Sequence, residues 1–332
     1  MGLPLLVVTF DLDEAGRSAV AAELGGGAEA VYLPRLDGVS RRDALRNATA
    51  VLARNTGKEL RGDEPALIGG ARLVQFMSAG VDFIPLRDLP AAVPVAGNGG
   101  AYAEPMAEHA AAMALAAAKR LLPEHAALAR GEFNQFKRNR MLAGGTCGIL
   151  GFGGIGAASA RLMRCLGMRV HAIRRSPPAD APVDWIGTPD RLDELLAAAD
   201  VLVVSLPLTR ATRNLIGARE LTLMKTDAIL VNLARGEILD ERALYEHLRA
   251  TPGFTACLDA WWVEPVRHGE FRMDHPFLEL PNVIGSPHNS ASVRGWREVA
   301  LRRAAANCRR ALEGREPLHL IGEDERAASS PA

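Results

Sequence analysis

A glycine-rich segment, GILGFGGIG, carries the clearest chemical signal in the sequence. Its glycines Gly151, Gly153 and Gly156 have the G-x-G-x-x-G spacing, with an apolar run before them and an amphipathic helical pattern after them. In this context the first glycine permits a tight turn and the second lets a pyrophosphate approach the backbone. The third allows the helix to pack closely, with its amino terminus toward the anion. A purely structural glycine turn is the alternative, but the context favours a dinucleotide site.

The segment VHAIRRSPP, from Val170 to Pro178, ends the next predicted strand. A dinucleotide site usually carries an acidic residue there, about 20 residues after the first glycine, to bind the ribose hydroxyls. Arg174 occupies this position and is followed by Arg175 and Ser176. Arginines cannot accept the ribose hydrogen bonds but can pair with a 2′-phosphate, so we expect NADP to be preferred over NAD. In the alternative, the arginines stack on the adenine or point into solvent, and NAD is preferred.

Alternating strand and helix patterns must position these residues, which predicts an α/β fold with parallel sheets. Strands are expected at residues 3–10, 30–33, 50–54, 72–77, 93–97, 146–150, 169–173, 200–206, 228–232, 254–258 and 282–285. The main helices are expected at residues 13–26, at 103–122 before Pro123, and at 291–313. The polar tail, residues 322–332, is expected to be disordered.

Five further segments surround the glycine turn in a fixed order. FMSAGVDFI and NGGAYAEPMAEHAAAMAL precede it, and VNLARGEILDERAL, CLDAWWVEP and SPHNS follow it. Together they resemble the D-isomer-specific 2-hydroxyacid dehydrogenase family over nearly the whole chain. The resemblance implies two Rossmann-like domains with parallel sheets and a cleft between them. The discontinuous substrate domain would comprise residues 1–98 plus 289–332, and the dinucleotide-binding domain residues 99–288. In the family the latter also makes the dimer contact, so we expect a homodimer.

The resemblance also implies the catalytic residues. Arg235 would grip the carboxylate and keto oxygen of a 2-oxo acid, and Glu264 would pair with His288, the proton donor. Backbone amides around Ala79 and Gly80 would hold the far side of the substrate carboxylate. These residue types suit the chemistry, because histidine exchanges protons near neutrality and a neighbouring carboxylate favours its imidazolium form. A planar guanidinium can donate two parallel hydrogen bonds to the substrate.

The expected reaction transfers a hydride between the nicotinamide and C2 of a small acid, of the glyoxylate or hydroxypyruvate type, to give the D-2-hydroxy acid. By the same resemblance Asp259 would lie near the nicotinamide carboxamide. The full set of expected cofactor contacts is Gly151, Gly153, Gly154, Ile155, Gly156, Arg174, Arg175, Ser176, Leu206, Pro207, Thr212, Leu233, Ala234, Arg235, Asp259 and His288. Other family members act on lactate, phosphoglycerate or phosphite. The alternative function is that of the family's transcriptional corepressors, which sense dinucleotide and bind proteins.

Several other polar residues have simpler interpretations. The pair Glu108–His109 lies within a helix that is structural in the family. His268 and His275 fit no metal-ligand spacing and are interpreted as solvated loop residues, so no metal is expected. The pair Trp261–Trp262 departs from the family pattern and either shapes the loop beside the cleft or packs it.

The composition sets limits on partners and location. Lys plus Arg equals Asp plus Glu at 39 each, which gives no general affinity for nucleic acid or an anionic membrane. No apolar run reaches the roughly 20 residues that span a bilayer. The amino terminus lacks a basic leader, and the four cysteines have no metal or redox spacing and are interpreted as core residues. We therefore expect a cytoplasmic protein whose partner is a small-molecule substrate.

Overall fold

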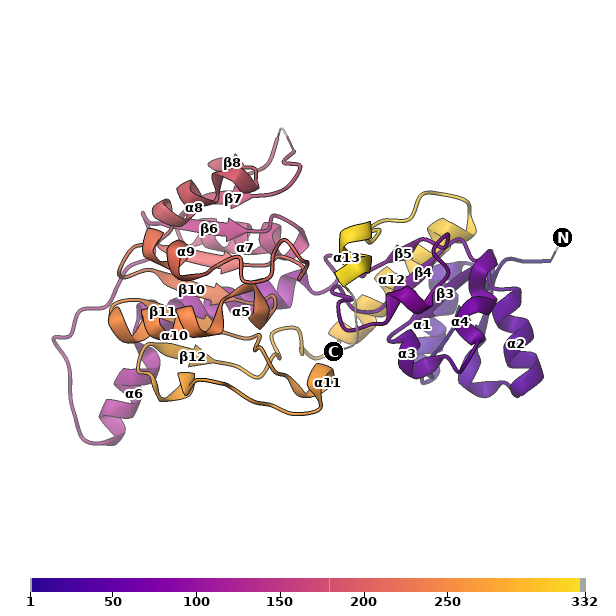
Figure 1. Cartoon of the computed structure of the whole chain (residues 1–332), viewed down its shortest axis with the longest axis horizontal. Helices are drawn as coiled ribbons and strands as arrows, with labels where there is room; N and C mark the ends of the chain where they lie inside the picture. Colours follow the sequence, from indigo (N-terminus) through magenta and orange to yellow (C-terminus); the bar gives the residue numbers. More distant parts are fainter. Residues whose placement is uncertain (1, 179, 329–332) are drawn as a thin grey trace. The chain divides into compact units, whose positions relative to one another are not determined.

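The computed structural model describes residues 2–178 and 180–328, and the chain forms two compact units (Figure 1). Unit 1 comprises Met1–Tyr102 and Val293–Ala332, and unit 2 comprises Ala103–Ser292. These bounds lie four residues beyond the domain boundaries that the family resemblance implied. The chain therefore passes from unit 1 to unit 2 and back again.

Unit 1 contains a five-stranded sheet in the order β2-β1-β3-β4-β5, and all its pairings are parallel. The strands are β1 (Leu5–Val8), β2 (Glu29–Tyr32), β3 (Ala50–Ala53), β4 (Val74–Phe76) and β5 (Val95–Ala96). The helices are α1 (Glu14–Leu24), α2 (Gly38–Arg46), α3 (Thr56–Glu59), α4 (Glu64–Leu67), α12 (Trp296–Leu312) and α13 (Glu323–Ala328). The C-terminal α12 packs against α1 and β3, so the two sequence-distant parts of this unit share one core.

Unit 2 contains a parallel seven-stranded sheet in the order β12-β11-β10-β9-β6-β7-β8. The strands are β6 (Thr146–Leu150), β7 (Arg169–Ile173), β8 (Trp185–Gly187), β9 (Val201–Val204), β10 (Ile229–Asn232), β11 (Thr255–Leu258) and β12 (Val283–Gly285). The helices are α5 (Ala103–Ala118), α6 (Leu121–Ala129), α7 (Gly154–Cys165), α8 (Leu192–Ala198), α9 (Ala218–Leu223), α10 (Glu241–Ala250) and α11 (Pro265–His268). Strands β6, β9 and β10 are buried throughout, as expected for the centre of a sheet covered on both faces.

Short 3-10 helices complete the described elements: η1 (Leu33–Arg35), η2 (Ile68–Gly70), η3 (Leu86–Asp88), η4 (Pro189–Arg191), η5 (Gly236–Ile238) and η6 (Phe277–Glu279). Strand order in unit 2 reverses between β6 and β9, which are adjacent. Because every strand is parallel, the loops that follow them all emerge at one edge of the sheet. Open α/β sheets bind ligands at this edge, beside the point of reversal.

The prediction of one helix from 103 to 122 is wrong. Helix α5 ends at Ala118, and Arg120 adopts a left-handed conformation (φ 52°) before α6 begins at Leu121. Pro123 therefore lies in the first turn of a new helix, where the missing amide hydrogen would have had no helical partner. The edge strand β8, only three residues long, was also not predicted.

The prediction of disorder in the tail is wrong for α13. The Arg326 guanidinium donates hydrogen bonds to the carbonyls of Leu89, Pro90, Ala91 and Val93. Arg87 also donates to the Ala327 carbonyl at 2.6 Å, so two arginine side chains anchor a segment whose composition alone gives no reason for order. Residues 329–332 of the predicted disordered tail lie outside the described residues.

Three of the four cysteines are core residues, as predicted: Cys147, Cys257 and Cys308 are buried. Cys165 is exposed at the end of α7, so its assignment to the core is wrong. Within the described ranges, no helix is both long enough and apolar enough to cross a bilayer.

Candidate functional site

The glycine turn after β6 leaves no space for side chains at two of its positions. Gly151 has a φ of 105°, and a Cβ there would lie 2.9 Å from the carbonyl of Ser205, which follows β9. A Cβ on Gly156 would lie 2.2 Å from the Gly151 oxygen. The Ser205 hydroxyl donates a 2.8 Å hydrogen bond to that same oxygen. The loops after β6 and β9 are therefore packed together at the reversal point.

Gly153 has the opposite surroundings. It is the N-cap residue of α7, no atom lies within 4 Å of where its Cβ would be, and no side chain caps the helix. The first-turn amides of Gly154 and Ile155 have no intrahelical acceptor, and their residues are at least partly exposed. An open backbone at the amino terminus of a 12-residue helix fits the pyrophosphate of a dinucleotide.

The two arginines follow β7 on the same edge. Strand β7 ends at Ile173, as predicted, and Arg174, Arg175 and Ser176 are all exposed. The Arg174 amide donates to the Gly187 carbonyl at 3.0 Å, which fixes the backbone at this position. No carboxylate of the described residues forms an ion pair with the Arg174 side chain.

Hydrogen bonds and close packing with neighbouring residues fix the loop that carries Arg235. The Asn232 side chain accepts from the Ala234 amide at 3.1 Å and donates to the Arg235 carbonyl at 2.9 Å. A Cβ on Gly236 would lie 2.3 Å from the Trp261 carbonyl carbon. Gly236 therefore allows the Arg235 loop to pack directly on the loop after β11.

Glu264 and His288 are hydrogen-bonded to each other on that edge. His288 Nδ1 lies 2.8 Å from Glu264 Oε1 and 2.9 Å from Oε2, and Oε1 also accepts from the Trp261 amide at 2.8 Å. Burial raises the pKa of the Glu264 carboxyl, but the hydrogen bond and charge of His288 and the charge of Arg235 outweigh it, so the net pKa lies below its usual value. Glu264 is thus an anion, Nδ1 is the donor, and Nε2 is the ring nitrogen that does not contact Glu264.

Asp259 is fully buried and lies under the His288 turn. It accepts hydrogen bonds from the Ser286 hydroxyl at 2.5 Å and from the amides of Asn289 and Ser290 at 3.1 and 3.3 Å. His109 Nε2 on α5 lies 3.0 Å from the Ser286 hydroxyl. Sequence reasoning assigned His109 only a structural role and did not consider Ser286, although Ser286 directly precedes the Pro287–His288 dipeptide.

The remaining predicted cofactor contacts also follow strands of unit 2. Thr212 donates to the Pro207 carbonyl at 2.7 Å and accepts from the Thr209 amide at 2.7 Å, so its hydroxyl holds its own loop. Leu206 is half-buried, and Leu233 and Ala234 are buried. These apolar residues shape the sheet edge beside the reversal point.

The loop with Ala79 and Gly80 follows β4 in unit 1. The Met77 carbonyl accepts from the Asn98 side chain at 3.2 Å and from the Tyr102 hydroxyl at 3.0 Å. A Cβ on Gly97 would lie 2.6 Å from the Ala79 oxygen. The hydrogen bonds of the described residues include none donated by the amides of Ala79 or Gly80. Both residues are half-buried.

Two assignments in the loop after β11 need correction or completion. His268 is not a solvated loop residue, because its Nδ1 accepts from the Glu264 amide at 2.9 Å. The Trp261 and Trp262 indoles donate to the carbonyls of Ser286 and Leu239, both at 2.8 Å, and both rings are buried. They pack this loop. No cluster that could hold a metal occurs among the described residues.

Comparisons with known proteins bear on this geometry. The family model "D-isomer specific 2-hydroxyacid dehydrogenase, NAD binding domain" matches residues 111–290. A glyoxylate reductase of Aeropyrum pernix is 33% identical over 262 residues, covering 76% of this chain and 77% of that protein. A D-3-phosphoglycerate dehydrogenase of Methanocaldococcus jannaschii is 34% identical over 211 residues, but the match covers 39% of its length.

Several of the curated relatives are thus matched over less than two thirds of their length, including a hydroxypyruvate reductase of Thermotoga maritima at 61%. A solved structure covers nearly the whole chain. The D-isomer specific 2-hydroxyacid dehydrogenase of Xanthobacter autotrophicus Py2, in complex with NADPH and MES, has a TM-score of 0.80 and 26% identity, covering 98% of this chain and 100% of that one. With the family model matching more than half of its residues, this chain belongs to the D-isomer-specific 2-hydroxyacid dehydrogenase family.

Proposed function

We propose that this protein is an NADP(H)-dependent reductase of a small 2-oxo acid, forming the D-2-hydroxy acid. The observation that carries the proposal is the Glu264–His288 pair, with His288 Nδ1 held at 2.8 and 2.9 Å from the carboxylate oxygens. It lies on the same sheet edge as the glycine turn. The proposed location is the cytoplasm, where the four free cysteines would stay reduced.

Each residue has a defined part in the proposed reaction. The nicotinamide, when bound, supplies the hydride. His288 donates the proton to the substrate oxygen from Nε2, while Glu264 holds the ring and balances its charge. Arg235 binds the substrate carboxylate and keto oxygen with two parallel hydrogen bonds. By the family resemblance, the backbone amides of Ala79 and Gly80 are further proposed to contact the substrate.

A panel of substrates tests this function. Glyoxylate and hydroxypyruvate are the first candidates, because relatives are named glyoxylate reductase and hydroxypyruvate reductase. Pyruvate, 2-oxoglutarate and phosphohydroxypyruvate complete the panel, and NADPH oxidation is followed for each. We expect the highest kcat/KM with glyoxylate or hydroxypyruvate. Tight NADPH binding without oxidation by any acid would favour the corepressor-like alternative, which the enzyme names of the relatives do not support.

The preference for NADPH rests on the exposed Arg174, Arg175 and Ser176 after β7. The related Xanthobacter autotrophicus structure contains NADPH. We expect Arg174→Asp to narrow or reverse the preference, because a carboxylate repels the 2′-phosphate and accepts from the ribose hydroxyls. The measurement is kcat/KM for NADPH and NADH. Arg249→Asp, at an exposed arginine on α10, is the control. A clear preference for NADH in the unmutated protein would refute the assignment.

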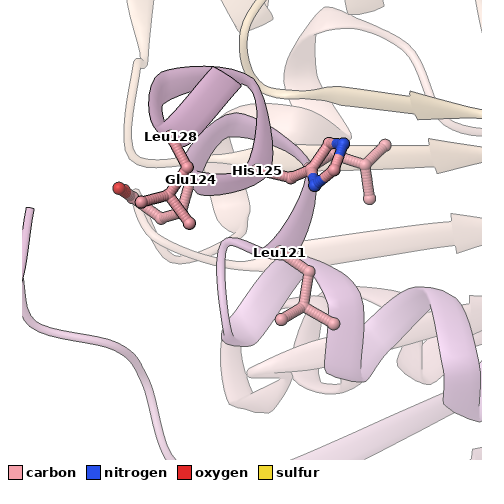
Figure 2. A pocket seen from close by; sticks show the side chains of 5 residues that line it. Leu121, Glu124, His125 and Leu128 are labelled. Carbon is pink, nitrogen blue, oxygen red and sulfur yellow. The ribbon is translucent and has the colours of Figure 1, made fainter. Parts of the chain in front are cut away.

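We further propose a homodimer through unit 2. Helix α6 and the loop after it expose Leu121, Leu122, Leu128, Phe133 and Phe136, the last of them 91% exposed. Figure 2 shows Leu121, Glu124, His125 and Leu128 projecting from α6, with the Glu124 carboxylate beside Leu128. Large apolar patches of this kind mark interaction sites. Light scattering should give twice the chain mass, and Leu121→Asp with Leu128→Asp should give a monomer. A monomer at micromolar concentration would refute it.

A further inference from the structure

The hydrogen bonds around Ser286 have a defined direction. The Asp259 carboxylate can only accept, so the Ser286 hydroxyl donates its one hydrogen at 2.5 Å. The Ser286 oxygen then offers only lone pairs to His109, whose Nε2 lies 3.0 Å away. His109 must therefore carry its proton on Nε2. The same nitrogen lies 3.8 Å from Asp259 Oδ1. The chain of donors runs from His109 through Ser286 to Asp259.

Asp259 in turn holds the backbone of the proton donor. Its two oxygens accept from the amides of Asn289 and Ser290, the residues that follow His288. His288 itself has a φ of 50°, in the left-handed region that non-glycine residues rarely adopt. Surrounding contacts must enforce such a conformation. The buried carboxylate is the group that fixes the amides on the C-terminal side of this turn.

We propose that His109 is a positioning residue for His288 that acts through Ser286 and Asp259, an inference that rests on the proposed function. Glu264 fixes the His288 ring through Nδ1. The hydrogen bonds from His109 through Ser286 to Asp259 fix the backbone from which the ring projects. Two independent contacts thus hold the proton donor. Helix α5, which carries His109, is in this way tied to the loops after β11 and β12.

Two substitutions of His109 separate positioning from simple packing. Glutamine places an amide nitrogen near the position of the imidazole Nε2, so His109→Gln keeps the donor, whereas His109→Leu removes it at similar volume. We expect His109→Leu to lower kcat on the order of 10-fold with KM nearly unchanged, because small displacements of a catalytic group slow the chemical step. His109→Gln should recover most of kcat. Glu108→Gln, the exposed neighbour on α5, is the matched control.

Ser286→Ala tests the series of hydrogen bonds from His109 to Asp259. If His109 acts through Ser286, the double variant His109→Leu with Ser286→Ala should be no slower than the slower single variant. Multiplicative losses would show that the two residues act separately and would overturn the proposal. A kcat for His109→Leu equal to that of the unmutated protein, or a His109→Gln variant as slow as His109→Leu, would also overturn it.

Amide hydrogen exchange at Asn289 and Ser290 provides a readout that does not depend on turnover. We expect exchange to be faster in His109→Leu than in the unmutated protein and to return toward normal in His109→Gln. Unchanged exchange in His109→Leu would overturn the proposal whatever the activity. If no 2-oxo acid is reduced by the unmutated protein, the proposed function fails, and the exchange result still decides whether His109 orders this turn.

Discussion

The two units use the same kind of parallel sheet in different ways. In unit 2 the carboxyl edge carries side chains held in networks, such as Glu264 with His288 and Asp259 with Ser286. In unit 1 the loop after β4 presents the amides of Ala79 and Gly80, which donate no hydrogen bond among the described residues. The side chains of Asn98 and Tyr102 both donate to the Met77 carbonyl at the start of this loop. We propose that the edge in unit 2 serves proton transfer and that the loop in unit 1 serves anion binding. Substitutions in the two units should therefore change different kinetic constants.

The largest effect is expected at the proton donor in unit 2. His288→Ala should lower kcat by about 10²–10⁴-fold, the usual contribution of general acid catalysis. The NADPH dissociation constant should change far less than kcat, because His288 is one of many expected cofactor contacts and the glycine turn and Arg174 are untouched. Steady-state kinetics and fluorescence titration with NADPH measure the two quantities. A variant with normal kcat on the best substrate would show that His288 is not the donor.

The next effect is expected at Arg235, also in unit 2. Arg235→Lys should raise KM and lower kcat, with a combined loss in kcat/KM of about 100-fold, although the charge is kept. A lysine ammonium cannot form two parallel hydrogen bonds with a carboxylate and its adjacent carbonyl. Kinetics with the best 2-oxo acid measure this loss. If both constants are unchanged, Arg235 does not bind the substrate.

A smaller effect, confined to KM, is expected from unit 1. A Cβ on Gly97 would lie 2.6 Å from the Ala79 oxygen, so Gly97→Ala should displace the loop that presents the two amides. We expect KM for the 2-oxo acid to rise about 10-fold, with little change in kcat. Gly70→Ala is the control, because no atom lies within 4 Å of its Cβ position. A fall in kcat as large as the rise in KM would contradict the proposal that the two units affect different kinetic constants.

The smallest effect concerns the pH dependence of stability. Because the pKa of Glu264 is lowered in the folded protein, its carboxylate stabilises unit 2 above its ordinary pKa, and this contribution is lost as the pH falls through the lowered value. Glu264→Gln should therefore reduce the free energy of unfolding by about 1–3 kcal/mol at pH 7. The difference from the unmutated protein should shrink below about pH 4.

Thermal unfolding of both proteins between pH 3 and 7 measures this difference. Glu279→Gln, an exposed carboxylate on η6, should change little at any pH. A constant difference between Glu264→Gln and the unmutated protein across this range would mean that the Glu264 charge does not contribute.

Sequence patterns predicted the strands of both sheets well, because buried parallel strands are continuous apolar runs between loops. Strand β7 was placed at 169–173 with both ends correct, which located Arg174. The break before α6 was missed because Arg120 carries no sequence signal for a left-handed conformation. The α13 helix was missed because hydrogen bonds of Arg326 and Arg87 connect it to residues distant in the sequence, which composition cannot reveal.

The same limit applies to the site. Glu264 and His288 were paired correctly from the family resemblance, and their distances confirm the contact. The role of His109 could not be predicted, since its partner Ser286 lies 177 residues away in the sequence. An ordered chain of donors depends on three-dimensional contacts between elements. A residue type and its spacing along one helix do not encode it.

The most direct test of the central claim is the stoichiometry and chirality of the product. The purified protein is incubated with NADPH and the 2-oxo acid of the panel that it reduces fastest, and the product is resolved on a chiral column. We predict one mole of D-2-hydroxy acid for each mole of NADPH oxidised, with at least about 100-fold less product from His288→Ala in the same time. Formation of the L enantiomer, or no hydroxy acid from any substrate while NADPH binds normally, would contradict the account.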